Sequence, residues 1–170
     1  MDFEISHSFE TDVETLSSVL LDEEYQRSLD DIGGLKERKL LSQKKEADGR
    51  VHRRVRCVLE INLSGMVKSF LGDSDPAWIE EAIWHPEKSR WEWVIHPEVA
   101  EGLLDAEGTI GIHGSDAGTN RVVSGKVRVK VPLYGGRVEG WIVEGIERAY
   151  DEEAARLAEW LTTDRRPLQT

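Results

Sequence analysis

The last third of the chain, residues 131–161, is the feature that most limits how the chain can fold. Its sequence, VPLYGGRVEGWIVEGIERAYDEEAARLAEWL, starts with the end of a strand-like alternation, passes a proline and two glycines, and continues as a helical pattern of about 25 residues. At ~1.5 Å per residue such a helix is ~40 Å long, as long as a small domain is wide. We therefore expect the other elements to fold against this helix.

The expected helix carries one apolar stripe at i, i+3, i+4 spacing. The stripe consists of Val138, Ile142, Gly145, Ile146, Ala149, Ala154, Leu157 and Leu161. A glycine inside a helix costs ~1 kcal/mol relative to alanine, so Gly145 needs a reason. Either the sheet approaches closely at this point, or Gly145 and Ala149 leave a shallow groove for a ligand. Gly135 and Gly136 are expected to reverse the chain with positive φ.

Length and composition limit the class of protein. A chain of 170 residues fits one domain, which we expect to span residues 1–162, with residues 163–170 as a flexible tail. No apolar run approaches the ~20 residues of a membrane span, and the N-terminus lacks the features of a signal peptide. The single cysteine, Cys57, excludes an internal disulfide and fits a reducing compartment. We expect a cytoplasmic protein, as a monomer or a homodimer.

The formal net charge of -11 argues against nucleic acid as a partner, because binding phosphates requires an excess of Lys and Arg. Residues 36–56 differ from the rest, with nine basic residues and three acidic ones. This segment is either the solvated face of a two-stranded ribbon or a patch that makes weak contact with an anionic surface or an acidic partner.

Alternation and turn signals before the long helix predict a helix pair and a series of strands. Residues 2–9 alternate as a half-buried strand, and two short amphipathic helices follow at 13–20 and 23–29, the first capped by Thr11 or Asp12. Asp48-Gly49 predicts a type I′ hairpin turn. Further strands are expected at 35–47, 50–61, 77–85, 90–96, 107–113 and 120–131, with a helical turn or edge segment at 64–71.

Consecutive hairpins with helices at the two ends indicate an α+β fold with an antiparallel sheet. A strongly curved sheet can wrap around a helix, and the space between them is a natural ligand cavity. The residues expected to face that space are Arg53, Val55, Cys57, Trp91, Trp93, Val127, Ile142, Gly145, Ile146 and Ala149.

Several of these residues have two interpretations. Trp91 and Trp93 share a strand face, where they either fill the core or grip a flat or acyl ligand. Arg53 lies on the same face as Val55, so its side chain either snorkels out of the sheet or is a buried cation that needs an anionic partner, such as a ligand carboxylate. Cys57 is interpreted as a small core residue.

Other chemistries lack their sequence signals. The five histidines form no His-x-His or His-x-x-x-His pair, so no metal site is expected. Gly108, Gly111 and Gly114 alternate with apolar residues inside a strand pattern, which does not suit a phosphate-binding loop. The chain contains no Gly-x-Ser-x-Gly nucleophile elbow. No cofactor is expected.

The order of elements resembles the START-like superfamily, also called SRPBCC, helix-grip or birch-pollen-allergen-like. The chain is most similar to a bacterial family of unassigned function in that superfamily, through residues 131–136 (VPLYGG), Glu139 and residues 159–161 (EWL). The resemblance implies a curved seven-stranded antiparallel sheet around the long C-terminal helix, with two short helices after the first strand. It also implies a cavity for a lipid-like or other apolar small molecule, and it supplies no catalytic residues.

These observations lead to one main hypothesis and two alternatives. The main hypothesis is a carrier or sensor that binds an apolar or amphipathic small molecule, lipid-like or aromatic, between the sheet and the helix. The first alternative is a cyclase- or hydratase-type enzyme that uses the same cavity, for example through Arg53 and a carboxylate such as Glu80. The second is an interaction module whose core is filled. An apolar void lined by polar side chains would favour the enzyme, and no void would favour the module.

Overall fold

The computed structural model describes residues 1–60, 75–98 and 102–163. The expected segment at 64–71, the end of the strand expected at 50–61, and the tail beyond residue 163 lie outside the described residues. In chain order the elements are β1 (Asp2–Phe9), α1 (Val13–Leu21), α2 (Glu23–Arg27), β2 (Leu35–Lys45), β3 (Val51–Leu59), β4 (Ala77–His85), the 3-10 turn η1 (Pro86–Lys88), β5 (Arg90–Pro97), β6 (Leu104–Ser115), β7 (Gly118–Val129) and α4 (Gly135–Thr162).

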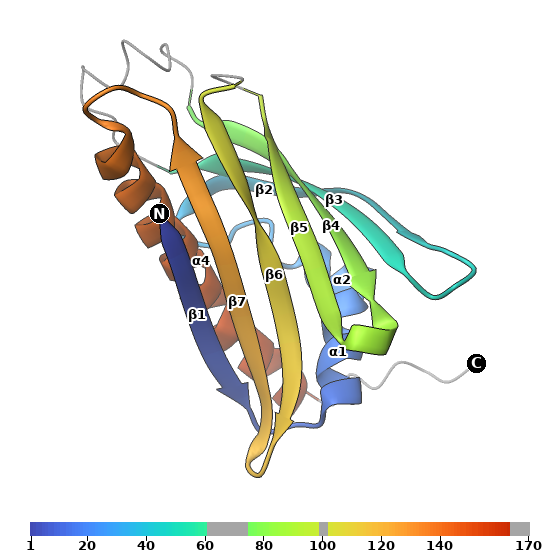
Figure 1. The fold of residues 1–170 in the computed structure, drawn as a ribbon. Helices are drawn as coiled ribbons and strands as arrows, with labels where there is room; N and C mark the ends of the chain where they lie inside the picture. The colour runs from blue at the N-terminus through green and yellow to red at the C-terminus, as the bar shows by residue number, and fades with distance from the viewer. Residues whose placement is uncertain (61–74, 99–101, 164–170) are drawn as a thin grey trace.

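The described strands form one antiparallel sheet in the order β1-β7-β6-β5-β4-β3-β2. Each strand from β2 to β6 pairs with the next one in the chain, and β1 joins the far edge beside β7. The sheet curves around α4, which runs along β1 and β7 (Figure 1). This confirms the expected α+β helix-grip fold, including the two short helices after the first strand. None of the described helices is long and apolar enough to span a membrane.

The two short helices begin at aspartate caps. The Asp12 carboxylate accepts a hydrogen bond from the Thr15 backbone N–H (2.7 Å), which selects Asp12 over Thr11 as the cap of α1. Asp22 ends α1 and caps α2 by accepting from the Glu24 and Tyr25 backbone N–H groups. The Tyr25 ring then packs edge-on against Trp160, with 5.3 Å between ring centroids, so α2 lies against the end of α4.

Two turns differ from the sequence prediction. At Asp48-Gly49 only Gly49 has positive φ (+85°), and the Gly49 N–H donates to the Glu46 carbonyl. This is a three-residue loop with a left-handed glycine, not the type I′ turn that was expected. Before α4 the positive φ falls on Leu133 (+65°), not on Gly135 or Gly136, which begin the helix. Gly135 is needed for space, because a Cβ there would lie 2.3 Å from the Val129 carbonyl oxygen.

The inward faces of β3 and β7 show the expected alternation, but each face includes one buried arginine. On β3 the buried positions are Val51, Arg53, Val55, Cys57 and Leu59, and Val58 is also buried, out of the alternation. On β7 they are Thr119, Arg121, Val123 and Val127. Both strands therefore place an arginine on the buried face of the sheet, and these two arginines help to form the site described below.

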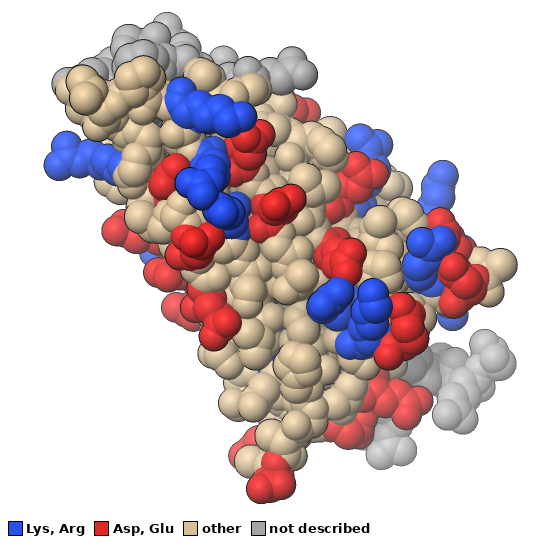
Figure 2. All heavy atoms as spheres, in the orientation of Figure 1, with Lys and Arg blue, Asp and Glu red and all other residues tan. Residues whose placement is uncertain are grey.

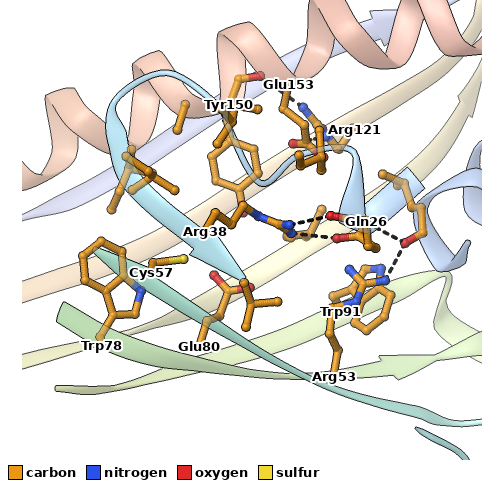
Figure 3. A pocket seen from close by; sticks show the side chains of 18 residues that line it. Gln26, Arg38, Arg53, Cys57, Trp78, Glu80, Trp91, Arg121, Tyr150 and Glu153 are labelled. Atoms are coloured by element: carbon orange, nitrogen blue, oxygen red, sulfur yellow. Dashed lines mark hydrogen bonds and ion pairs between the residues drawn. The ribbon is translucent and has the colours of Figure 1, made fainter. Parts of the chain in front are cut away.

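The basic segment 36–56 has a mixed charge on the folded protein. Arg38 and Arg53 point toward the interior (Figure 3). Lys36, Arg50 and Arg56 form ion pairs with Asp75, with Glu46 and Asp48, and with Glu37 and Glu98, respectively. On the face shown in Figure 2, basic and acidic side chains alternate. This pairing favours a solvated ribbon over an anionic-surface contact.

Candidate ligand-binding cavity

Two adjoining cavities lie between the sheet and the helices. The larger has a volume of about 120 Å³ and is lined by residues of α1, α2, β2 to β7 and α4 (Figure 3). The smaller has a volume of about 60 Å³ and lies among apolar side chains, including those of Phe3, Trp93 and Ile95. Four residues line both cavities: Trp78, Glu80, Ile146 and Tyr150.

The structure brings most of the sequence-predicted residues to these cavities. Arg53, Val55, Cys57, Trp91, Ile146 and Ala149 line the larger cavity, and Trp93, Ile142 and Ile146 line the smaller one. Val127 and Gly145 line neither. Val127 is fully buried in the core. Gly145 lies against neighbouring elements, because a Cβ there would be 3.0 Å from Leu59 Cδ1. Its absent side chain therefore allows close packing rather than forming a groove.

Sequence reasoning missed much of the polar lining. Gln26, Arg38, Trp78, Arg121, Tyr150 and Glu153 all line the larger cavity, and Glu80 was named only as a possible partner of Arg53. Arg121 could have been found, since it lies two residues before buried Val123 and shares its strand face, as Arg53 shares the face of Val55. Arg38 could not. Its strand carries register irregularities between Leu35 and Glu37 and between Leu40 and Ser42, which break the alternation that assigns side chains to a face.

Arg53 is buried with neutral partners. Its side chain is 8% exposed, and its guanidinium lies 4.2 Å from the centre of the Trp91 ring. Arg53 Nε donates to Gln43 Oε1 (2.8 Å), and Nη2 donates to the Leu20 carbonyl at the end of α1. The C-terminus of a helix carries partial negative charge, so this cation stabilises it. Burial lowers the pKa of Arg53 to about 10, so the side chain is still charged at neutral pH.

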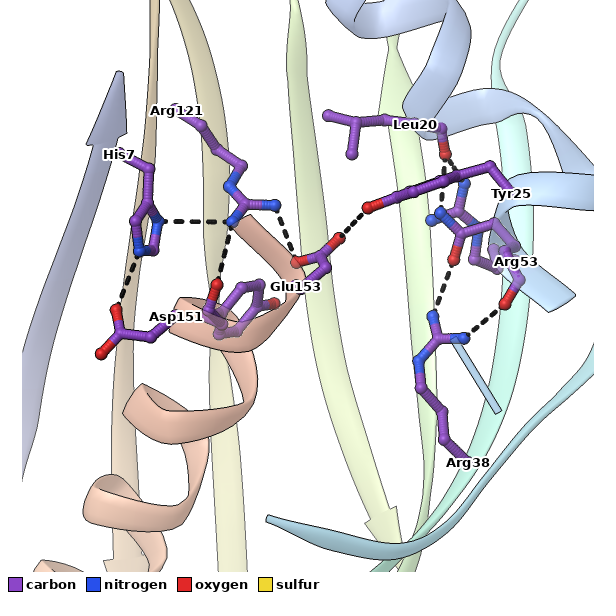
Figure 4. Close-up of polar contacts among 10 residues, drawn as sticks. His7, Leu20, Tyr25, Arg38, Arg53, Arg121, Asp151 and Glu153 are labelled. Atoms are coloured by element: carbon purple, nitrogen blue, oxygen red, sulfur yellow. Dashed lines mark hydrogen bonds and ion pairs between the residues drawn. The ribbon is translucent and has the colours of Figure 1, made fainter. Parts of the chain in front are cut away.

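Arg38 donates hydrogen bonds to α2, as Arg53 does to α1. Its Nη1 donates to the Gln26 carbonyl (2.8 Å) and its Nη2 donates to Gln26 Oε1 (2.7 Å). Gln26 Nε2 in turn donates to the Leu20 carbonyl (3.0 Å), the same oxygen that Arg53 binds (Figure 4). The two arginines and Gln26 thus fasten both short helices to β2 and β3.

Arg121 forms an ion pair with Glu153 in the lining of the larger cavity. Its side chain is 1% exposed, and its Nη1 lies 2.7 Å from Glu153 Oε2. Its Nη2 faces His7 Nδ1 (3.3 Å), which must accept this hydrogen bond. The ring proton of a neutral His7 then lies on Nε2, 2.9 Å from Asp151 Oδ1. Tyr25 donates its hydroxyl proton to Glu153 Oε1 at 3.5 Å, so the network joins β1, α2, β7 and α4 (Figure 4).

Glu80 and Tyr150 differ from the other polar residues of the lining. Within the described part of the chain, neither the Glu80 carboxyl nor the Tyr150 hydroxyl has a hydrogen-bond or ion-pair partner. Both residues are half-buried, and both line the two cavities. Burial raises the pKa of the Glu80 carboxyl, against the opposing effect of Arg38 and Arg53. Burial also raises the pKa of the Tyr150 phenol well above its ordinary value. These two groups are free to interact with a bound molecule.

The pair of Arg53 and Glu80 suggested from the sequence is not in direct contact. Within the described residues Arg53 donates to Gln43 Oε1 and to the Leu20 carbonyl, and neither acceptor is a carboxylate. The two side chains line the same cavity and influence each other through their charges only. Acid/base chemistry at this site would therefore rest on Glu80 and Tyr150.

Comparison with known proteins places the chain in a family and a fold. The fold is shared with a Thermus thermophilus protein, TTHA0849 (TM-score 0.66, 17% identity, covering 94% of this chain and 99% of that one). It is also shared with the ZhuI aromatase/cyclase of Streptomyces sp. R1128 (TM-score 0.64, 11% identity, 96% of each chain). A START superfamily protein of Mycobacterium smegmatis gives a TM-score of 0.62 at 18% identity, covering 95% of this chain and 99% of that one.

Identities this low establish the fold alone, which is START-like. No curated protein matches the sequence. Residues 4–161 match the family described as "Protein of unknown function (DUF2505)". Because this match covers nearly the whole chain, the protein is a member of the DUF2505 family.

Proposed function

We propose that this protein binds a small amphipathic molecule in the two cavities between the sheet and α4. The observation that carries the proposal is the junction at Glu80 and Tyr150, where two polar groups without protein partners in the described residues stand between two mainly apolar cavities. Binding sites for small molecules typically combine apolar walls with a few convergent polar groups. The START-like fold supports the same interpretation.

The volumes limit the size of the molecule. An apolar cavity of ~150 Å³ admits benzene, so the larger cavity, at about 120 Å³, suits roughly one six-membered ring. The smaller cavity, at about 60 Å³, suits a short alkyl or acyl extension. A ligand of about a dozen non-hydrogen atoms therefore fits better than a long lipid chain. A void of this kind favours ligand binding over an interaction module with a filled core.

The proposal is tested by filling the larger cavity. Ala149 lines it, whereas Ala158 lies exposed on the same helix. We expect Ala149→Leu to weaken binding of alkylbenzene and short acyl probes at least tenfold, with Ala158→Leu as the matched control that binds like the parent protein. Quenching of the cavity tryptophans measures affinity, and native mass spectrometry measures stoichiometry. Failure of every probe to bind, or equal binding by the Ala149→Leu protein, would contradict the proposal.

A second candidate function is proton-transfer catalysis on the bound molecule. It is favoured by one observation, a carboxyl group and a phenol that line both cavities without a partner in the described residues and whose burial favours their neutral forms. Such groups can donate protons to a substrate. If a compound that co-purifies with the protein is converted during incubation, and Glu80→Gln and Tyr150→Phe retain binding but stop conversion, the protein is an enzyme. Unchanged compound over the same period supports a carrier or sensor.

A further inference from the structure

The charges around the larger cavity do not balance. Its lining contains three guanidinium groups, those of Arg38, Arg53 and Arg121, and two carboxyl groups, those of Glu80 and Glu153. Arg121 and Glu153 neutralise each other in a direct ion pair. The two remaining arginines donate only to neutral oxygens, and Glu80 is the one carboxyl of the lining that forms no ion pair within the described residues. Counted over these lining residues, positive charge exceeds negative charge by at least one, and a buried charge without a counter-ion is costly.

We infer that the cavity binds a small amphipathic monoanion, a carboxylate on an aromatic or short aliphatic body, with its charged end on Arg38 and its apolar end in the smaller cavity. This inference rests on the proposed function. One negative charge of the ligand would supply the counter-ion that the protein lacks. A guanidinium is well suited to this role, because it binds a carboxylate through two parallel hydrogen bonds.

Arg38 is the arginine with capacity for a ligand. Arg121 is already paired with Glu153, and Arg53 is covered by Trp91 and the end of α1. Arg38 is half-buried, and its described hydrogen bonds use one N–H of Nη1 and one of Nη2, both toward Gln26. A guanidinium has five N–H donors, so three N–H groups of Arg38 have no described partner. Arg53 has as many, but its side chain is buried against the Trp91 ring.

The smaller cavity sets the orientation of the ligand. Apart from Glu80 and Tyr150 at the junction, it is lined by apolar and aromatic residues, among them Phe3, Trp93, Ile95 and Ile142. The aliphatic end of an amphipathic molecule gains most by burial there, while the carboxylate stays on the side of Arg38. Glu80 then lies beside the ligand, where a negative charge on its carboxyl opposes that of the ligand.

The test compares three probes of one shape: 4-butylbenzoate, 4-butylbenzyl alcohol and 4-butylbenzylamine. We expect the carboxylate to bind at least tenfold more tightly than the other two. Arg38→Gln should reduce carboxylate affinity to that of the alcohol and leave alcohol affinity unchanged. Arg54→Gln, an exposed arginine of β3, is the matched control and should change neither. Titration calorimetry measures all three affinities.

Because Arg38 also holds α2, a second variant keeps the test decisive if Arg38→Gln does not fold. Glu80→Gln removes a negative charge from the site, so it should tighten carboxylate binding several-fold and leave the alcohol unaffected. The inference is overturned if the alcohol or the amine binds as tightly as the carboxylate, or if Arg38→Gln weakens all three equally. In those cases the proposed function stands; if no probe binds, both fail.

Discussion

At the scale of single residues, Glu80 is a carboxyl group whose ionisation the fold opposes. It lies on the inner face of β4, where Arg38, Arg53, Cys57, Tyr150 and Glu153 are the charged and titratable groups around it. Burial favours its neutral form, and the two arginines only partly offset this. The native carboxyl thus has a higher pKa than the unfolded one, whose ordinary value is 4.5. Glu80 therefore makes the stability of the protein depend on pH.

The sign of this dependence follows from proton binding. Between the unfolded pKa of Glu80 and its higher native pKa, the native state binds more protons, so stability falls as pH rises through that range. Glu80→Gln removes the effect. We expect the variant to be more stable than the parent at pH 7 and almost unchanged in stability near pH 4. Urea unfolding of the ligand-free proteins at the two pH values measures this.

The control for this prediction is Glu107→Gln, at an exposed position of β6. It should show no pH-dependent difference in unfolding free energy. Equal effects of Glu80→Gln at both pH values would show that the amide acts through packing rather than through loss of a charge.

The sequence predicted individual cavity residues where a strand alternates regularly. Val55 and Cys57 follow from the period of β3, and Trp91 and Trp93 from that of β5. What no local pattern reveals is the partner of each buried polar group. Arg53 was expected either to reach solvent or to meet an anion, but its partners come from the end of α1 and from β2, which only the folded chain brings close.

At the scale of elements, the short helices α1 and α2 depend on the sheet for their position. They are nine and five residues long, too short to be stable alone. Besides apolar packing, they are held by donors from β2 and β3: Gln43 Nε2 donates to the Leu21 carbonyl (2.6 Å), and Arg38 and Arg53 bind the carbonyls described above.

Removing one of these donors should loosen the helix pair selectively. Arg53→Met retains much of the apolar stem but leaves the Leu20 carbonyl and Gln43 Oε1 without the Arg53 donors. We expect a loss of about 2–4 kcal/mol in unfolding free energy, together with faster amide exchange in residues 13–29 and little change in β6 and β7. Arg54→Met, one residue away and exposed, should change neither quantity. Uniformly faster exchange throughout the sheet would contradict a local role for Arg53.

The strands and the long helix were largely predictable from the sequence, and the turns between elements were not. Period-2 alternation located the strands, and the apolar stripe located α4. The left-handed residue before α4 is Leu133, although two glycines follow within three positions. Gly135 is instead required where the helix meets the Val129 carbonyl, a contact that the turn sequence does not report.

At the scale of the whole molecule, the larger cavity lies where the sheet, the two short helices and α4 come together. The larger cavity draws residues from both short helices, six strands and α4, so it is complete only when the entire domain is folded. The START-like topology was recognisable from element order, but this assembly of the lining was not. A consequence is that ligand binding and global folding are linked.

This linkage gives a prediction for whichever of the three probes binds most tightly. A ligand that binds only the native state stabilises it by ~2.7 kcal/mol when its free concentration is one hundred times its Kd. For a domain of this size, 1 kcal/mol corresponds to ~2–4 °C, so Tm should rise by roughly 5–10 °C. The Ala149→Leu protein, with its larger cavity filled, should show no rise at the same concentration. A probe that titrates onto the parent protein yet leaves its Tm unchanged would be binding a surface that the unfolded chain also offers. Protection of α2 and α4 from amide exchange in the complex would instead place the probe between them, where the cavity lining predicts it.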